Sequence, residues 1–140
     1  MDAPVERIWE LVGDPNRHPE WWPKVIEVNG ERFDEGSEYV QVTRSAMGKD
    51  ETTDFVVERK QEMREIKLRC QVSGTYAHWL MTEAQGATFV DVEFGMDPKG
   101  LGLRLFDGAF GRIYFRRWME QSVEGLKRAA TDKAEAPVPD

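Results

Sequence analysis

The 140-residue sequence predicts one α+β domain, in which two short helices precede an antiparallel sheet of about six strands and a long C-terminal helix. Three observations predict it. Apolar residues recur at helical spacing near the N-terminus, and they do so again in the last third of the chain. Between residues 25 and 97 the apolar period changes to two, and polar or glycine-containing turns interrupt it.

Helix signals open the chain. Asp2 and Pro4 are typical of a helix start, and Gly13 is typical of a helix end. Asp14-Pro15 repeats the start signal, and the prolines that follow allow only a short second helix, from Asp14 to about Trp22. The first helix carries its apolar residues at helical spacing: Val5, Ile8, Trp9 and Val12.

Alternation of apolar and charged residues predicts strands with one face in the core and one in solvent. The strands are expected at residues 25–33, 37–45, 50–60, 63–72, 74–84 and 87–97. A hairpin at Gln85-Gly86 sets a register in which Met81 faces Val90 and Trp79 faces Val92. In that register Tyr76, His78 and Leu80 point outward, and the inward residues of the fifth strand are Thr75, Ala77, Trp79 and Met81.

Helical spacing returns after Pro98 and continues to about Ala130. The second half of this segment has one apolar face, formed by Phe115, Trp118, Met119, Ser122, Leu126 and Ala129. The first half has an apolar stripe that is rotated around the helix axis relative to that face, formed by Leu103, Phe106, Phe110 and Ile113. Gly108 and Gly111 lie where the stripe changes, so we expect a bend, a break or a lid-like first half there. Residues 131–140 lack large apolar side chains and are expected to form a flexible tail after a single domain over 1–130.

Composition excludes several classes of protein. Nineteen Lys and Arg against 26 Asp and Glu give a net charge of −7, which argues against binding nucleic acid or an anionic membrane. Cys70 is the single cysteine, so an internal disulfide and a multi-cysteine zinc site are ruled out. No apolar run is long enough to span a bilayer and no secretory signal is visible, so a cytoplasmic protein without a metal or cofactor is expected.

Few side chains suggest catalysis, and no catalytic residue is assigned. The two histidines belong to no catalytic motif: we expect a surface or capping role for His18 and an outward position for His78. Cys70 lies on the inward parity of its strand, together with Ile66, Leu68 and Val72, and is expected to be a buried, inert thiol. The carboxylates of the strands alternate with apolar residues and are therefore expected on the solvent-exposed face of the sheet, where paired acid–base catalysis is not expected: Asp54, Glu58, Asp91 and Glu93.

Two N-terminal segments resemble the START-like superfamily, also called SRPBCC or helix-grip proteins, and within it the polyketide cyclase/dehydrase-like branch. Residues 2–12 (DAPVERIWELV) resemble the first helix of that branch, and residues 14–23 (DPNRHPEWWP) resemble its second. The resemblance covers about residues 1–130. It implies a curved antiparallel sheet wrapped around the last helix, with an internal apolar cavity between them.

One departure from the family concerns the edge of the sheet. Family members carry a strand before the first helix, and this sequence has only Met1 before Asp2-Ala3-Pro4. The strand at 87–97 is therefore expected to lack a neighbour. Two explanations follow: either this edge pairs across a homodimer, or the natural chain begins upstream of Met1. The oligomeric state stays open between monomer and homodimer.

The helix-grip arrangement implies that core residues also line the cavity. From the sheet these are Phe55, Val57, Ile66, Leu68, Trp79, Met81, Val90, Val92 and Phe94, and from the helix Phe106, Phe110 and Trp118. Tyr39, Thr53 and Thr75 are expected as inward polar contacts. Arg117 belongs either to a solvated helix face or to the pocket mouth, where it would meet an acidic ligand.

The resemblance implies binding of a small hydrophobic or aromatic molecule, lipid or polyketide-like, by a carrier or sensor. The alternative is an enzyme of the polyketide cyclase, aromatase or dehydratase type. Inward polar residues are few, which favours binding over catalysis. A third class, a protein-binding chaperone regulator, would need an exposed apolar patch, for which only Tyr76 and Leu80 are candidates.

Overall fold

The computed structural model describes residues 1–45, 47–96 and 109–135, and its elements follow the predicted α+β order. Two short helices, α1 (Val5–Val12) and α2 (His18–Trp21), are joined by the 3₁₀ helix η1 (Pro15–Arg17). The long helix α3 (Ala109–Glu135) follows the sheet. The strands between them are β1 (Val25–Asn29), β2 (Glu38–Arg44), β3 (Asp50–Gln61), β4 (Glu65–Cys70), β5 (Thr75–Ala84) and β6 (Ala87–Met96).

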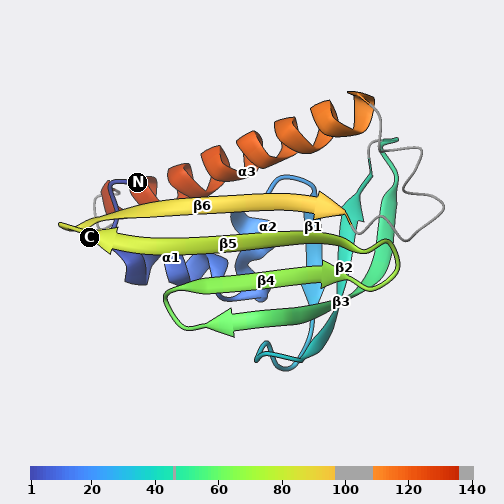
Figure 1. Ribbon diagram of the computed structural model, residues 1–140, viewed down its shortest axis with the longest axis horizontal. Coiled ribbons are helices and arrows are strands. Elements are labelled where there is room, and N and C mark those ends of the chain that lie inside the picture. The colour runs from blue at the N-terminus through green and yellow to red at the C-terminus, as the bar shows by residue number, and fades with distance from the viewer. Residues whose placement is uncertain (46, 97–108, 136–140) are drawn as a thin grey trace, which may run out of the picture.

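The six strands form one antiparallel sheet in the order β1-β2-β3-β4-β5-β6. The sheet curves between its two edges, and α3 runs along it beside β6 (Figure 1). This is the helix-grip arrangement that the resemblance implies. The predicted register of the last hairpin is confirmed, because Trp79 lies opposite Val92 and Met81 opposite Val90. Gln85 and Gly86 both have positive φ, 54° and 81°, as a two-residue turn of this hairpin type requires.

Strand β4 is shorter than predicted. It ends at Cys70, and Gly74, at φ 76°, donates from its backbone nitrogen to the Cys70 carbonyl at 2.9 Å and closes a turn. Val72 therefore lies outside the ladder and is 75% exposed, although its parity predicted an inward position. β1 likewise ends at Asn29 rather than at residue 33.

The start of α1 also differs from the prediction. Its N-cap is Pro4, and no side chain of that cap satisfies the first turn. Instead Glu83, from the end of β5, accepts a hydrogen bond from the Val5 backbone nitrogen at 3.1 Å. A tertiary contact with a carboxylate thus replaces the expected cap by Asp2 and favours the positive end of the helix dipole.

The core lies between the inner face of the sheet and the three helices. Its most buried apolar members come from α1, the sheet and α3, each at most 1% exposed: Ile8, Leu11 and Val12 from α1, Val57, Ile66, Leu68 and Trp79 from the sheet, and Leu126 and Ala130 from α3. Apolar burial of this kind is the main force that holds the layers together. Cys70 is buried at the same face, as expected.

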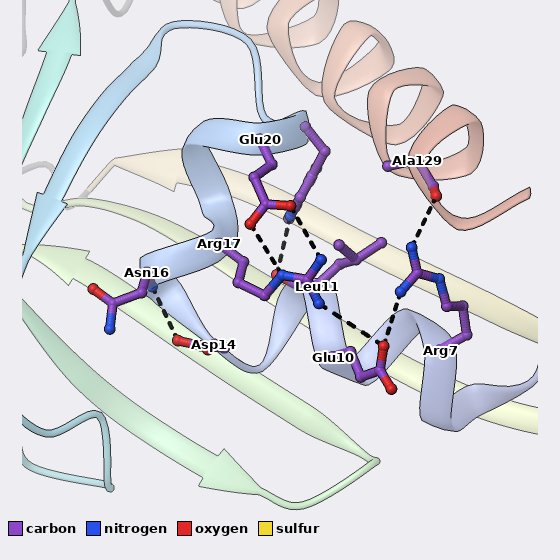
Figure 2. Close-up of polar contacts among 9 residues, drawn as sticks. Arg7, Glu10, Leu11, Asp14, Asn16, Arg17, Glu20 and Ala129 are labelled. Carbon is purple, nitrogen blue, oxygen red and sulfur yellow. Dashed lines mark hydrogen bonds and ion pairs between the residues drawn. The ribbon is translucent and has the colours of Figure 1, made fainter. Parts of the chain in front are cut away.

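The C-terminal half of α3 is docked on the N-terminal helices. Arg7 of α1 donates to the Ala129 carbonyl at 3.2 Å and pairs with Glu10 at 2.8 Å (Figure 2). The helix continues to Glu135, past its predicted end at Ala130, because residues 131–135 (TDKAE) include good helix formers although they lack large apolar groups. Of the residues at which a bend, break or lid is expected, Leu103, Phe106 and Gly108 lie outside the described residues, and Gly111 lies within α3.

Strand β6 is an edge of the sheet, as predicted. At one point it is paired with the segment before α1: the Met1 amino group donates to the Thr88 carbonyl at 2.7 Å, and the Thr88 nitrogen donates to the Met1 carbonyl at 2.9 Å. The Thr88 hydroxyl also donates to the Ala3 carbonyl at 2.8 Å. Pairing of this edge across a homodimer, or with residues upstream of Met1, stays a prediction.

Candidate functional site

A small pocket lies between the inner face of the sheet and α3. Its free volume is about 30 Å³, well below the roughly 300–1,000 Å³ of pockets that hold drug-sized ligands. The residues that line it come from α2, four of the strands and α3: Trp22, Gln41, Phe55, Leu68, Thr75, Tyr76, Ala77, Phe94 and Trp118. None of these nine carries a formal charge at neutral pH.

Three aromatic rings from different elements close one side of the pocket. The ring centroid of Phe94 on β6 lies 5.2 Å from that of Trp118 on α3, and Trp22 lies 5.7 Å from Phe94 and 6.2 Å from Trp118. Trp79 packs behind them, edge-on to Trp22 at 5.4 Å. Such pairs contribute about 1 kcal/mol each beyond the area they bury. The pocket therefore has an aromatic wall that rearranges only if several rings move.

Most polar atoms of the lining already have a partner. Trp118 Nε1 donates to the Pro23 carbonyl at 2.7 Å, and Tyr76 Oη donates to Glu93 at 2.6 Å on the outer face. Thr75 Oγ1 accepts from Ser73 Oγ at 2.9 Å. Trp22 Nε1 is buried without a hydrogen-bond partner. An uncharged, mostly apolar surface of this kind suits an uncharged, mostly apolar ligand.

His18 supports this wall from behind, and the expectation of a surface position for it is wrong. The side chain is fully buried, because it is enclosed by α1 and by Trp21 and Trp22. These two tryptophans belong to residues 18–23, which comprise α2 and the two residues after it and are called the α2 segment below. Its Nε2 lies 2.8 Å from the Val12 carbonyl, so Nε2 carries the proton and caps the last turn of α1. Desolvation lowers the pKa of His18 from 6.5 to about 4, and its ring lies 5.0 Å from that of Trp22.

The structure brings five of the sequence-predicted site residues to this pocket: Phe55, Leu68, Thr75, Phe94 and Trp118. Val57, Ile66, Trp79 and Met81 are buried in the adjoining core, and Val90 and Val92 are half-buried against it. Phe106 lies outside the described residues, and Phe110 is placed on α3 without a described side chain.

The predicted polar contacts take different positions. Tyr39 is buried and stacks on Phe55 at 5.6 Å, and burial raises the pKa of its hydroxyl, which has no hydrogen-bond partner. Thr53 is half-buried opposite Gln41 in the β2–β3 register. Arg117 is exposed on α3 and is not among the residues of this pocket.

Four lining residues were not named as cavity residues from the sequence: Trp22, Gln41, Tyr76 and Ala77. Ala77 was expected to point inward, as it does, whereas Tyr76 was expected to point outward. A signal for Gln41 existed, because it lies two residues after Tyr39 in the same strand and therefore shares its inward parity. Trp22 was assigned to the second helix without a direction. Its burial follows from the helix packing against β1 and α3.

The outer face of the sheet carries a polar network. His78 Nε2 lies 2.6 Å from Glu65, as its outward parity predicts. Glu58 pairs with Arg69 and with Lys67, and the hydrogen bond from Arg69 is the largest cause that lowers the pKa of Glu58. This face therefore looks like a solvated surface with satisfied charges.

Neither a metal centre nor a membrane span is visible in the part of the chain that the structure describes. No three histidine, cysteine or carboxylate side chains gather there as ligands of one ion would. No helix in the same part is long and apolar enough to cross a bilayer.

Fold and pocket define a helix-grip protein, and the comparisons name its family. Residues 1–131 match the family described as polyketide cyclase / dehydrase and lipid transport, so the chain belongs to that family, within the SRPBCC superfamily. Among curated protein sequences, none matches this chain.

Solved structures support the same fold at low sequence identity. Protein NE0264 from Nitrosomonas europaea is 13% identical with a TM-score of 0.74, over 96% of this chain and 92% of that one. The polyketide-cyclase-like protein Cgl2372 from Corynebacterium glutamicum is 17% identical with a TM-score of 0.59, over 100% and 92%. The di-domain aromatase/cyclase StfQ of the steffimycin biosynthetic pathway is 19% identical with a TM-score of 0.68, over 92% of this chain and 46% of StfQ.

Proposed function

We propose that the protein binds a small, uncharged hydrophobic or aromatic molecule, lipid or polyketide-like, between α3 and the sheet, and acts as a carrier or sensor. The observation that carries this proposal is the composition of the pocket lining. Among the described residues it combines four large aromatic side chains with no charged one: Trp22, Phe55, Phe94 and Trp118. Membership of a family whose description includes lipid transport agrees with it.

The pocket must widen before such a molecule can enter, because its free volume of about 30 Å³ is far below the roughly 300–1,000 Å³ of ordinary ligand pockets. Burial along α3 indicates which part moves. Ser122, Leu126 and Ala130 are fully buried, whereas Trp118 is half-buried and Ile113 is 58% exposed. We infer that the first turns of α3 swing outward with Trp118 while the docked C-terminal half stays in place.

We favour a binding protein over an enzyme. A cyclase or dehydratase needs a group that moves a proton beside the substrate. In the described lining the only titratable side chain is Tyr76, whose hydroxyl is held by Glu93 on the outer face. Gln41 and Thr75 can orient a ligand, but neither exchanges protons at neutral pH.

An occlusion experiment tests the proposal. Ala77→Leu adds three carbon atoms inside the pocket, and Ala84→Leu makes the same change at an exposed position of the same strand. The uncharged fluorescent probe N-phenyl-1-naphthylamine should bind the wild type and Ala84→Leu alike, and Ala77→Leu should bind it at least about tenfold more weakly. Equal binding by the two folded variants would refute a ligand site at this pocket.

A further inference from the structure

Gln41 in β2 is a polar side chain with an unused hydrogen-bonding end in the aromatic pocket. It is 3% exposed, and Tyr39 and Thr43 share its inward face. Its Nε2 lies 2.8 Å from Thr43 Oγ1, and no described residue contributes a hydrogen bond to its Oε1. This end of the amide is therefore free to bind a partner that is absent from the protein itself.

The rest of the lining leaves little else for a polar ligand group to meet. Tyr76 Oη and Trp118 Nε1 donate to Glu93 and to the Pro23 carbonyl, and Thr75 Oγ1 accepts from Ser73 and keeps its own proton to donate. Trp22 Nε1 is a further donor without a partner. The described lining residues thus offer one unused amide end, one unused indole N–H and the proton of the Thr75 hydroxyl, and none of them carries a charge to balance a charged ligand.

The amide of Gln41 can serve as acceptor or donor. As placed, Nε2 donates to Thr43 and Oε1 is left to accept. If the amide turns by 180°, the Thr43 hydroxyl donates to Oε1, and Nε2 is left to donate. A hydroxyl group satisfies both orientations because it donates and accepts. A hydrocarbon satisfies neither and leaves the amide buried without a partner.

We propose that Gln41, held by Thr43, is the specificity-determining residue of the pocket and selects uncharged aromatic ligands that carry a hydroxyl group. This inference rests on the proposed function, because it names the class of ligand for the same pocket. Gln41 contacts the ligand directly, and Thr43 is a positioning residue that holds the amide.

The test compares two probes of the same size and shape, 2-naphthol and 2-methylnaphthalene, by isothermal titration calorimetry. Gln41→Leu keeps the volume and removes both hydrogen-bonding ends. It should weaken 2-naphthol binding roughly tenfold and leave 2-methylnaphthalene unchanged or tighter. Thr43→Val keeps Gln41 and removes its anchor, so it should weaken 2-naphthol by a few-fold only. Thr52→Val, at an exposed position on β3, is the matched control and should change neither probe.

The outcomes separate the two proposals. A wild type that binds neither probe overturns the proposed function and this inference with it. If the wild type binds both probes, the ratio of its affinities for 2-naphthol and 2-methylnaphthalene decides. A ratio that is the same in Gln41→Leu and in Thr43→Val as in the wild type overturns this inference alone. If Gln41→Leu does not fold, Gln41→Met replaces it, and the same change in the ratio is expected.

Discussion

Gly125 on α3 touches the backbone of the α2 segment at the carbonyl oxygen of Trp21. A Cβ atom at this position would lie 2.2 Å from that oxygen, closer than real contacts allow. Since the obstacle is backbone and not the tip of a flexible side chain, it cannot move aside cheaply. The glycine therefore lets α3 approach the α2 segment closely enough to bury Leu126 and to place Trp118 over the pocket.

Gly125→Ala should accordingly destabilise the protein by about 1–3 kcal/mol, as overpacking does elsewhere. In an unobstructed helix interior the same change stabilises by up to about 1 kcal/mol, so the sign of the effect is diagnostic. Urea denaturation followed by tryptophan fluorescence measures it. A variant as stable as the wild type, or more stable, would show that α3 does not approach the α2 segment this closely.

Stability should fall as the pH is lowered from about 6.5 toward 4, because of His18. The pKa of this side chain is about 4 in the folded protein and 6.5 ordinarily, so between these values the unfolded chain binds a proton that the folded protein does not. The contribution of the neutral His18 to the free energy of unfolding is complete above pH 6.5 and amounts to about 3 kcal/mol at most. Measured unfolding free energies over this range test it.

His18→Gln is the control for that experiment. Its amide N–H can replace the hydrogen bond from His18 Nε2 to the Val12 carbonyl, but the side chain does not titrate. The difference in unfolding free energy between wild type and His18→Gln should shrink or change sign toward pH 4, in favour of the variant. A constant difference from pH 7 to 4 would mean that His18 titrates alike in the folded and unfolded chain.

The two halves of α3 should differ in local stability. Hydrogen–deuterium exchange should be at least roughly tenfold faster for residues 113–119 than for residues 122–130, because the latter include the fully buried Ser122, Leu126 and Ala130, whereas Trp118 of the former is only half-buried. Trp118→Phe keeps a ring but removes the hydrogen bond to the Pro23 carbonyl, so it should widen the difference. Uniform protection along α3 would contradict entry of a ligand by movement of its first turns.

Periodicity made much of the fold predictable. The alternation around Trp79 and Val92, with a turn at Gln85-Gly86, was sufficient for a register that the structure confirms. The prediction from alternation was wrong at Val72. The alternation of apolar and polar residues continues to this position in the sequence, but strand β4 ends at Cys70 and Val72 is exposed. Local pattern cannot report where a turn takes the chain out of the sheet.

The site was less predictable because burial of polar residues depends on tertiary contacts. Nothing near His18 in sequence reveals that its ring reaches the Val12 carbonyl and is enclosed by two tryptophans. Gln41 has inward parity, but a glutamine in a strand is ordinarily assigned to the solvent face. Only the arrangement of β2, the α2 segment and α3 shows that it lines an aromatic pocket.

The central claim is that a small uncharged aromatic molecule binds between α3 and the sheet. Its most direct test is an NMR titration of the ¹⁵N-labelled protein with 2-naphthol, followed at the tryptophan indole N–H signals. Trp22 and Trp118 line the pocket, whereas Trp9 packs against Gly13 on α1. The account predicts saturable shifts of the Trp22 and Trp118 signals and a stationary Trp9 signal. No shift at saturating ligand, or a shift of Trp9 alone, would contradict it.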